Sequence, residues 1–319
     1  MTPHGLPSDQ YHCLLDEQPY YLTPPYLLGR TESPGPLIVN PACWFSWHGA
    51  LPADKATRLR FTECLLPSER MVWVEDPATL AIWPYWLGEE YFEFVSRMQP
   101  GRALEEELPL HIRWVLTEAR VLVEPNYLAK RRCEWRHESL EYANAFRGGY
   151  VNVPGLIQPF HVGALRRYYR CRTRSGRYVL GDEQVRRRFA AHNEPVCRFL
   201  QHQLSHAVSD IAGIVVKPSY AYFIAYLGGA KLERHVDREQ CDYSVTTCVD
   251  ASPEPHGESQ WPIHLQTATE ESSIWQFLGD ALLYRGCSVA HSREELADGL
   301  TSTSLLLHYV SESFEGGLD

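Results

Sequence analysis

The spacing of apolar residues changes along the chain and separates a helical part from a β-rich part. Between Ala53 and about Tyr142, apolar residues recur at intervals of three and four, most clearly in Leu87–Met98 and Leu104–Val123, with charged residues between them. This is the period of amphipathic helices. After Gly213, short runs of β-branched and aromatic residues are separated by turn residues, a pattern typical of strands.

The β-rich part contains a series of short runs that we interpret as strands. They comprise residues 214–216, 220–226, 243–249, 261–265, 273–278, 281–285, 288–291 and 302–310. So many short strands in one segment predict a jelly-roll sandwich or barrel. Gly and Pro residues at 147–155 mark a boundary between a mainly helical N-terminal region, residues 1–150, and a β-rich domain, residues 151–319. The predicted fold class is therefore α+β.

Three features of the N-terminal region favour structural roles. Residues 1 to about 52 are rich in Pro, Tyr and Trp without a sustained period, which predicts an ordered arm packed against the body. His48, within this arm, is interpreted as a packed or exposed histidine and not as a metal ligand. Glu105–Glu107, followed by Pro109, fit the acidic first turn of a helix.

A basic segment precedes the strands. Leu165–Arg188 holds nine arginines, which indicate either a solvated basic face or a site for an anionic substrate, peptide or carrier. A helical pattern opens at Asp182 and continues to Ile211, and Pro195 is expected to kink or split this helix.

Composition narrows the classes of function. A net charge of −10 and a pI near 5.8 disfavour a general nucleic-acid or anionic-membrane binder, because both need a basic surface. The nine cysteines form no Cys-x-x-Cys pair, as expected of reduced thiols in a cytoplasmic protein. The N-terminus shows no secretory signal, and no apolar stretch is long enough to cross a bilayer.

The candidate chemistry lies at His235, Asp237 and His291. His235 and Asp237 are two residues apart, so on a strand or at its exit both side chains leave the same face. With His291 they would supply two neutral imidazoles and one carboxylate to one side of a metal ion. That donor set leaves other positions open and suits Fe(II) oxygen chemistry.

The strand before His235 and the segment before His291 resemble the iron site of the Fe(II)/2-oxoglutarate-dependent dioxygenases. Tyr226 and Gly229 resemble their counterparts in the prolyl-hydroxylase-like branch, where the tyrosine touches 2-oxoglutarate. The resemblance covers roughly residues 156–310. It implies a double-stranded β-helix (jelly-roll) core, Fe(II) held by the three residues above, 2-oxoglutarate as cosubstrate, and O2.

One departure from this branch concerns the cation that holds the distal carboxylate of 2-oxoglutarate. The last strand begins Leu300–Ser304 and carries no Arg or Lys there. Arg293 is the best substitute, because it would share the pocket-facing direction of His291, although a salt bridge to a neighbouring glutamate is an equal alternative. Arg285 is the second choice, and Ser304 is expected to add a hydroxyl contact, as is Ser302.

The resemblance implies a hydroxylase for a small molecule, amino acid or peptide, with an anionic substrate suggested by the arginines. Related halogenases have Gly or Ala in place of Asp237, so this carboxylate favours hydroxylation. Two alternatives stay open: a cupin-like binding protein with a vestigial metal site, and an iron oxidase that does not use 2-oxoglutarate. The N-terminal region would serve as a helical cover or as the surface of a homodimer.

Overall fold

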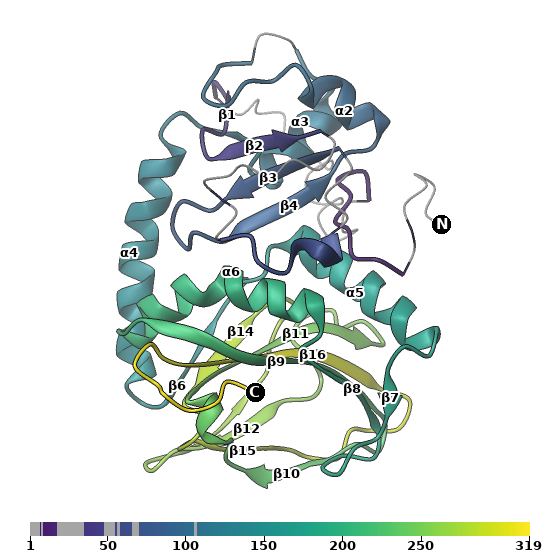
Figure 1. The fold of residues 1–319 in the computed structure, drawn as a ribbon, viewed down its shortest axis with the longest axis vertical. Coiled ribbons are helices and arrows are strands. Elements are labelled where there is room, and N and C mark those ends of the chain that lie inside the picture. Colours follow the sequence, from purple (N-terminus) through teal and green to yellow (C-terminus); the bar gives the residue numbers. More distant parts are fainter. Residues whose placement is uncertain are drawn as a thin grey trace. The chain divides into compact units, whose positions relative to one another are not determined.

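The computed structural model divides the chain into two compact units, and Figure 1 traces both. The first comprises residues 1–136 and 159–164, and the second comprises residues 137–158 and 165–319. The residues that the structure describes are 7, 9–17, 35–47, 55, 58–65, 70–104 and 107–319. His48 lies outside them, so its interpretation stays a prediction. Together the described residues form a mixed α/β structure with large antiparallel sheets.

The first unit contains two small antiparallel sheets. One has the order β2 (Cys43–Ser46), β3 (Met71–Glu75) and β4 (Ile82–Trp86), and the other pairs β1 (Ile38–Val39) with β5 (Leu122–Val123). The prediction of a mainly helical region is wrong at β3 and β4. The first four residues of β3 and all five residues of β4 are buried, so neither strand shows a period of two.

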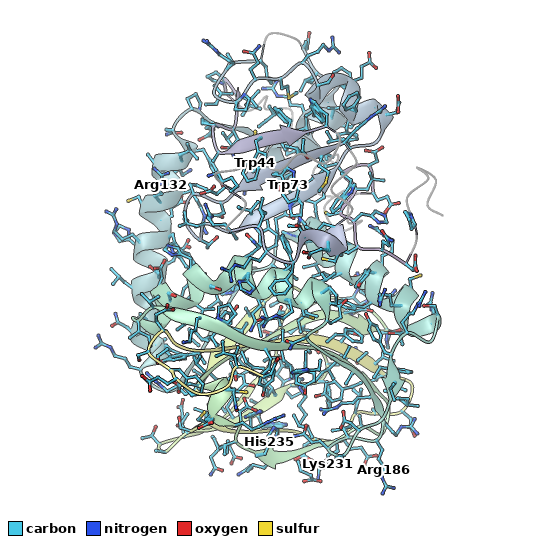
Figure 2. The ribbon with its side chains drawn as sticks, in the orientation of Figure 1. Trp44, Trp73, Arg132, Arg186, Lys231 and His235 are labelled. Carbon is cyan, nitrogen blue, oxygen red and sulfur yellow. The ribbon has the colours of Figure 1, made fainter. Side chains whose placement is uncertain are left out.

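Aromatic packing joins the strands of the larger of these sheets. Trp44 of β2 stacks on Trp73 of β3, with ring centroids 6.1 Å apart and nearly parallel planes (Figure 2). The early arm adds to the other edge, where the backbone N–H of Leu15 donates to the carbonyl of Trp86 and the N–H of Trp86 donates to the carbonyl of Cys13.

The helices predicted before residue 124 are confirmed in position but are shorter than expected. They are α2 (Glu89–Val95) and α3 (Leu110–Glu118), with a 3₁₀ turn, η2, at Thr62–Leu65. Helix α3 begins after Pro109, so Glu107 precedes the helix and the prediction of an acidic first turn is wrong for this residue. Pro109 is compatible with a helix start because the first amides of a helix need no intrahelical acceptor. The long helix α4 spans Tyr127–Phe146.

The second unit is built on two antiparallel sheets. The larger has the strand order β6-β14-β11-β16-β9-β8-β7, and the smaller has the order β10-β15-β12-β13. The predicted strands after Gly213 are confirmed, two of them merged into β9. From β9 to β16 the chain alternates between the two sheets, except that the consecutive strands β12 and β13 pair with each other in the smaller sheet. The strands are β6 (Tyr150–Val153), β7 (Val179–Leu180), β8 (Arg188–His192), β9 (Val216–Leu227), β10 (Leu232–His235), β11 (Tyr243–Ser252), β12 (Ile263–Gln266), β13 (Glu271–Ile274), β14 (Ala281–Tyr284), β15 (Ala290–Arg293) and β16 (Thr301–Ser311), with a 3₁₀ turn, η3, at Glu239–Cys241.

Helix α6 (Pro195–Ala212) packs against β9 and β16 of the larger sheet (Figure 1). Pro195 starts this helix and does not kink it, which corrects the predicted helix from Asp182. The carboxylate of Glu194 accepts hydrogen bonds from the next free amides, those of Val196 and Cys197. Gly213 ends the helix in the left-handed conformation, with φ of 71°.

Helix α5 (Pro159–Arg174) carries much of the basic segment. All nine cysteines lie among the described residues and none forms a disulfide there. Within the described parts of the chain, the search for a helix both long and apolar enough to cross a bilayer finds none.

Candidate metal centre and its cavity

The structure brings His235, Asp237 and His291 together in the second unit. Strand β10 pairs antiparallel with β15, so that His235 lies directly opposite His291. Asp237 follows two residues after the end of β10. Its Oδ1 atom lies 3.8 Å from Nε2 of His235 and 3.6 Å from Nε2 of His291. One ligand atom from each residue lies within 4.8 Å of the other two, a spacing that one metal ion can bridge.

Backbone carbonyls fix the orientation of both histidines. Nδ1 of His235 lies 2.8 Å from the carbonyl oxygen of Glu233, and Nδ1 of His291 lies 3.2 Å from that of Val289. A carbonyl can only accept, so Nδ1 carries the hydrogen in each ring and Nε2 keeps its lone pair for a metal. Burial also lowers the pKa of His291, which favours the neutral imidazole that a ligand must be.

Asp237 is held by its second oxygen and its backbone. The hydroxyl of Ser244 donates to Oδ2 at 2.8 Å, and the N–H of Asp237 donates to the carbonyl of Gly286 at 2.9 Å. Nδ1 of His308 lies 2.9 Å from the same hydroxyl oxygen. Because the Ser244 hydrogen is directed to Asp237, His308 is the donor in that second bond. The chain from His308 through Ser244 thus fixes Oδ2 and leaves Oδ1 facing the histidines.

A cavity of about 620 Å³ opens beside the three residues. Its walls come from both sheets. Successive inward positions of β8, β9 and β16 line it at a spacing of two, as the pleat of a strand requires. These positions are Arg188, Ala190 and His192 on β8, Tyr220, Tyr222, Ile224 and Tyr226 on β9, and Ser304, Leu306 and His308 on β16.

Arg293 lines the same cavity and is 5% exposed. Its Nη1 donates to the carbonyl of Trp261 at 2.6 Å, and its guanidinium lies 4.7 Å from the centre of the Trp261 ring. No carboxylate of the described residues forms an ion pair with it, so the alternative of a salt bridge to Glu294 or Glu295 does not hold. Burial lowers the pKa of Arg293, because loss of contact with water disfavours the charged guanidinium.

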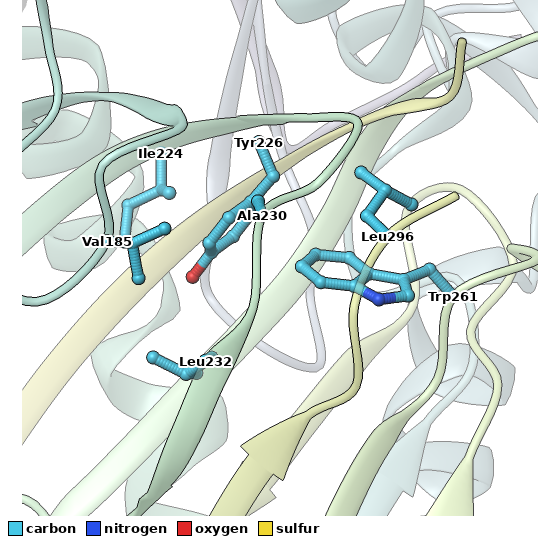
Figure 3. Packing of buried hydrophobic residues seen from close by; sticks show 7 residues of the cluster. All are labelled: Val185, Ile224, Tyr226, Ala230, Leu232, Trp261 and Leu296. Atoms are coloured by element: carbon cyan, nitrogen blue, oxygen red, sulfur yellow. The ribbon is translucent and has the colours of Figure 1, made fainter. Parts of the chain in front are cut away.

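Tyr226 and Ser304 also lie at this wall. The Tyr226 ring stands edge-on to Trp261, with centroids 4.8 Å apart, within the buried cluster drawn in Figure 3. The Ser304 hydroxyl is buried and has no hydrogen-bond partner in the part of the chain that the structure describes.

The structure does not place Arg285 with these residues. Tyr284, at the end of β14, faces the cavity, and side chains alternate along a strand, so its neighbour Arg285 points away. The Arg285 guanidinium instead lies over the rings of Phe146 and Tyr243, at 5.1 and 5.6 Å.

Three arginines of the basic segment, Arg166, Arg170 and Arg188, form ion pairs with acidic residues of the same chain. Arg166 donates to Asp250 at 3.0 Å and to Glu254 at 2.8 Å, while Arg170 donates to Asp250 at 2.6 Å. Arg166 and Asp250 are well buried, with side chains 11% and 7% exposed. Of the nine arginines, Arg188 lines the cavity. Arg166 therefore does not support the interpretation of this segment as a binding site for an anionic substrate, because its guanidinium is already paired with Asp250 and Glu254.

Sequence reasoning missed the turn between β7 and β8. Gln184 and Arg188 line the cavity, and the Nε2 atom of Gln184 lies 3.3 Å from Nε2 of His235. The apolar spacing of Val185 and Phe189 fits a helix by coincidence. The alternation of Arg188, Ala190 and His192 was the available signal for a strand whose one face meets the cavity.

The chain has similar counterparts among solved structures. No protein-family model and no curated protein matches it. Among solved structures, it is similar to a prolyl-4-hydroxylase of Pseudomonas putida, with 15% identity, a TM-score of 0.46, and coverage of 55% of this chain and 100% of that chain. It is also similar to a prolyl hydroxylase of Trichoplax adhaerens in complex with a hypoxia inducible factor peptide fragment, with 14% identity, a TM-score of 0.47, and coverage of 56% and 90%.

A third similar structure is HygX of Streptomyces hygroscopicus, solved with nickel, 2-oxoglutarate and hygromycin B bound. It has 15% identity, a TM-score of 0.43, and coverage of 55% of this chain and 88% of that chain. At such identities, and with TM-scores below 0.5, the activity of this chain has to be argued from its own residues.

Proposed function

We propose that the chain is an Fe(II)- and 2-oxoglutarate-dependent oxygenase that hydroxylates an unactivated carbon atom. The observation that carries the proposal is the grouping of His235, Asp237 and His291, whose ligand atoms lie within 4.8 Å of one another beside a cavity. Two neutral imidazoles and a carboxylate suit Fe(II) and leave coordination positions open. The distribution of β9–β16 over two sheets, with a change of sheet at every step except β12 to β13, supports a double-stranded β-helix, with residues 151–319 as the oxygenase domain.

The residues present fit such a metal. His235 and His291 would bind it through Nε2 and Asp237 through Oδ1, because their other polar atoms are already engaged by carbonyls and by Ser244. With Fe(II), 2-oxoglutarate and O2 bound, the site would couple decarboxylation of 2-oxoglutarate to succinate with oxidation of a substrate C–H bond. The buried part of the cavity wall, which includes Ile224, Tyr226 and Tyr284, would keep water away from the reacting carbon.

Arg293 would bind the distal carboxylate of 2-oxoglutarate. A buried guanidinium is unfavourable without a compensating charge, and a dicarboxylate in the cavity would supply that charge. Tyr226 and Ser304 line the same wall and would add hydroxyl contacts. Arg285, which lies over Phe146 and Tyr243, is no longer a candidate for this role.

The substrate would be a small molecule, or an amino acid or peptide side chain. The cavity volume lies within the range of small-molecule sites. Its lining carries both signs of charge, with Asp182 and Glu183 against Arg188 and Arg238. A polar substrate that offers both donor and acceptor groups fits this lining better than a purely anionic one.

The test is to add Fe(II) and 2-oxoglutarate to the purified protein without O2. The measured signal is the weak visible charge-transfer band of the chelate. We expect the band in the wild type, its loss in His291→Ala, and its loss or strong weakening in Arg293→Ala. Arg285→Ala is the matched control, because it removes the same charge outside the cavity, and it should keep the band.

Other outcomes would select the other functions. Iron binding without the band would overturn the use of 2-oxoglutarate, and the iron oxidase would then be the better interpretation if O2 were consumed. Metal or ligand binding without any turnover would identify a cupin-like binding protein. A band of equal strength in Arg293→Ala and Arg285→Ala would overturn the assignment of Arg293.

A further inference from the structure

The turn between β7 and β8 is fixed at its base by Asp182. The Oδ1 atom of Asp182 accepts the backbone N–H groups of Gln184 at 2.9 Å and Val185 at 2.8 Å. Its Oδ2 atom accepts Nε of Arg188 at 2.6 Å. One carboxylate therefore ties the start of the turn to its end, an arrangement that suits Asp because its short side chain reaches the next amides.

The same turn is anchored to the walls of the cavity. Val185 is buried in the cluster with Ile224, Tyr226 and Leu232, and Figure 3 shows it beside Ile224. The N–H of Leu227 donates to the carbonyl of Arg187 at 2.9 Å, which pairs the turn with the end of β9. The turn is thus held from within itself and from the sheet, so its backbone is fixed where it presents the exposed residue Gln184 to the cavity.

Arg188 sets the direction of the Gln184 amide. Its Nη2 atom donates to Oε1 of Gln184 at 2.9 Å. A guanidinium has no acceptor, so the amide oxygen must face Arg188 and the amide NH2 must face the other way. That NH2 group lies 3.3 Å from Nε2 of His235, which is the atom that would bind the metal.

We infer that Gln184 is an additional ligand-binding residue, whose amide NH2 donates a hydrogen bond to an oxygen ligand on the metal held by His235, Asp237 and His291. The inference rests on the proposed function for its metal. The oxygen ligand is water when the metal alone is bound and a 2-oxoglutarate oxygen when the cosubstrate joins it. Both are acceptors for the same N–H, and Arg188 prevents the amide from rotating to present its oxygen.

The experiment uses Co(II) as the metal, with and without 2-oxoglutarate, and three variants of the full chain. Gln184→Ala removes the donor and should weaken 2-oxoglutarate binding about 2- to 10-fold, the value of one hydrogen bond. Gln184→Glu puts a carboxylate oxygen beside the metal. We expect this variant to bind Co(II) about 10-fold more tightly or better and to change the visible spectrum, because groups that surround a metal site change metal affinity by about this factor.

Arg186→Gln is the matched control. It lowers the net charge by the same amount as Gln184→Glu, on the same turn, but Arg186 does not line the cavity and points outward in Figure 2. Its Co(II) spectrum and its affinities for Co(II) and 2-oxoglutarate should match those of the wild type. A long-range effect of charge would instead change both variants alike.

The inference is overturned if Gln184→Ala and Gln184→Glu both keep the Co(II) spectrum and both affinities within about twofold of the control. Failure of the proposed function gives a different result. If the wild type binds Co(II) but not 2-oxoglutarate, the oxygenase proposal fails, while the Co(II) spectra and affinities still decide the role of Gln184. A wild type that binds no metal overturns both.

Discussion

The hydroxyl of Ser244 donates a hydrogen bond of 2.8 Å to Oδ2 of Asp237, which lies in the segment between β10 and η3. Ser244 is on β11, and its oxygen is itself held by His308 of β16. A metal ligand whose second oxygen is fixed keeps the first one aimed at the ion, and the loss of such a partner weakens metal binding.

The first prediction concerns this bond. Ser244→Ala should lower the affinity for Co(II) about 10- to 100-fold without unfolding the chain, because Asp237 loses the contact that orients it. Isothermal titration with Co(II) measures the effect. Ser313→Ala, an exposed serine near the C-terminus, is the control and should titrate like the wild type. Equal affinities for the two variants would show that Asp237 needs no support from Ser244.

The second prediction concerns Gly286, which lies against Asp237. A Cβ at this position would come within 2.5 Å of Oδ2 of Asp237 and 2.3 Å of the Cys241 carbonyl oxygen. Gly286→Ala should therefore displace Asp237, lower the free energy of unfolding by about 1–3 kcal/mol, and weaken Co(II) binding. Gly257→Ala is the control, because its Cβ would meet a Phe277 ring carbon at 3.9 Å, an ordinary contact.

Urea unfolding and Co(II) titration of the two glycine variants separate these effects. Loss of metal affinity with little loss of stability would mean that the alanine moves Asp237 alone. Wild-type affinity in Gly286→Ala would contradict the close approach of Gly286 to the metal ligand.

The grouping of His235, Asp237 and His291 could be predicted from sequence because much of its geometry is local. His235 and Asp237 are separated by one residue, so a strand or its exit places both on one face, and His291 follows a recognisable run of strand residues. The strands after Gly213 were likewise predictable, since β-branched and aromatic runs alternate with turns there. The partners of Asp237 were not, because Ser244 and His308 reach it only through the pairing of β11 with β16.

Other errors have similar physical causes. Strands β3 and β4 are buried almost throughout, so their sequences lack the alternation that identifies a half-exposed strand. The turn at Asp182 depends on side-chain hydrogen bonds that a hydrophobic pattern does not record. Arg285 was misplaced because its neighbour Tyr284, and not Arg285, occupies the inward position of β14.

The third prediction is a pH dependence of stability from two buried histidines. Burial lowers the pKa of His161 to about 3 and that of His308 to about 4, from an ordinary value of 6.5. Both folded-state values lie below the unfolded value, so the unfolded chain takes up protons first as the pH falls. These two histidines therefore leave the free energy of unfolding unchanged above pH 6.5 and lower it progressively as the pH falls toward 4. Each should add a slope of about 1.4 kcal/mol per pH unit within this window.

Urea unfolding at several pH values between 4.5 and 6.5 measures the slope. His161→Gln retains an acceptor for the Tyr11 hydroxyl, which hydrogen-bonds to Nδ1 in the wild type, and should reduce the slope by about one proton. His256→Gln, at an exposed position, serves as the control. An unchanged slope in His161→Gln would mean that this histidine is not kept neutral by burial.

The last prediction separates structure from substrate binding at Arg166. Its guanidinium pairs with Asp250 and Glu254, and its side chain is only 11% exposed. Removing one partner of a buried pair leaves the other charge uncompensated, so Arg166→Ala should lower the free energy of unfolding by about 3–5 kcal/mol. Arg174→Ala, at the exposed end of α5, should have little effect.

Because Arg166 does not line the cavity, a 2-oxoglutarate chelate band should survive in the folded fraction of both variants. A stable Arg166→Ala protein with a selectively weakened affinity for an anionic substrate would reverse this assignment and restore a binding role for the basic segment.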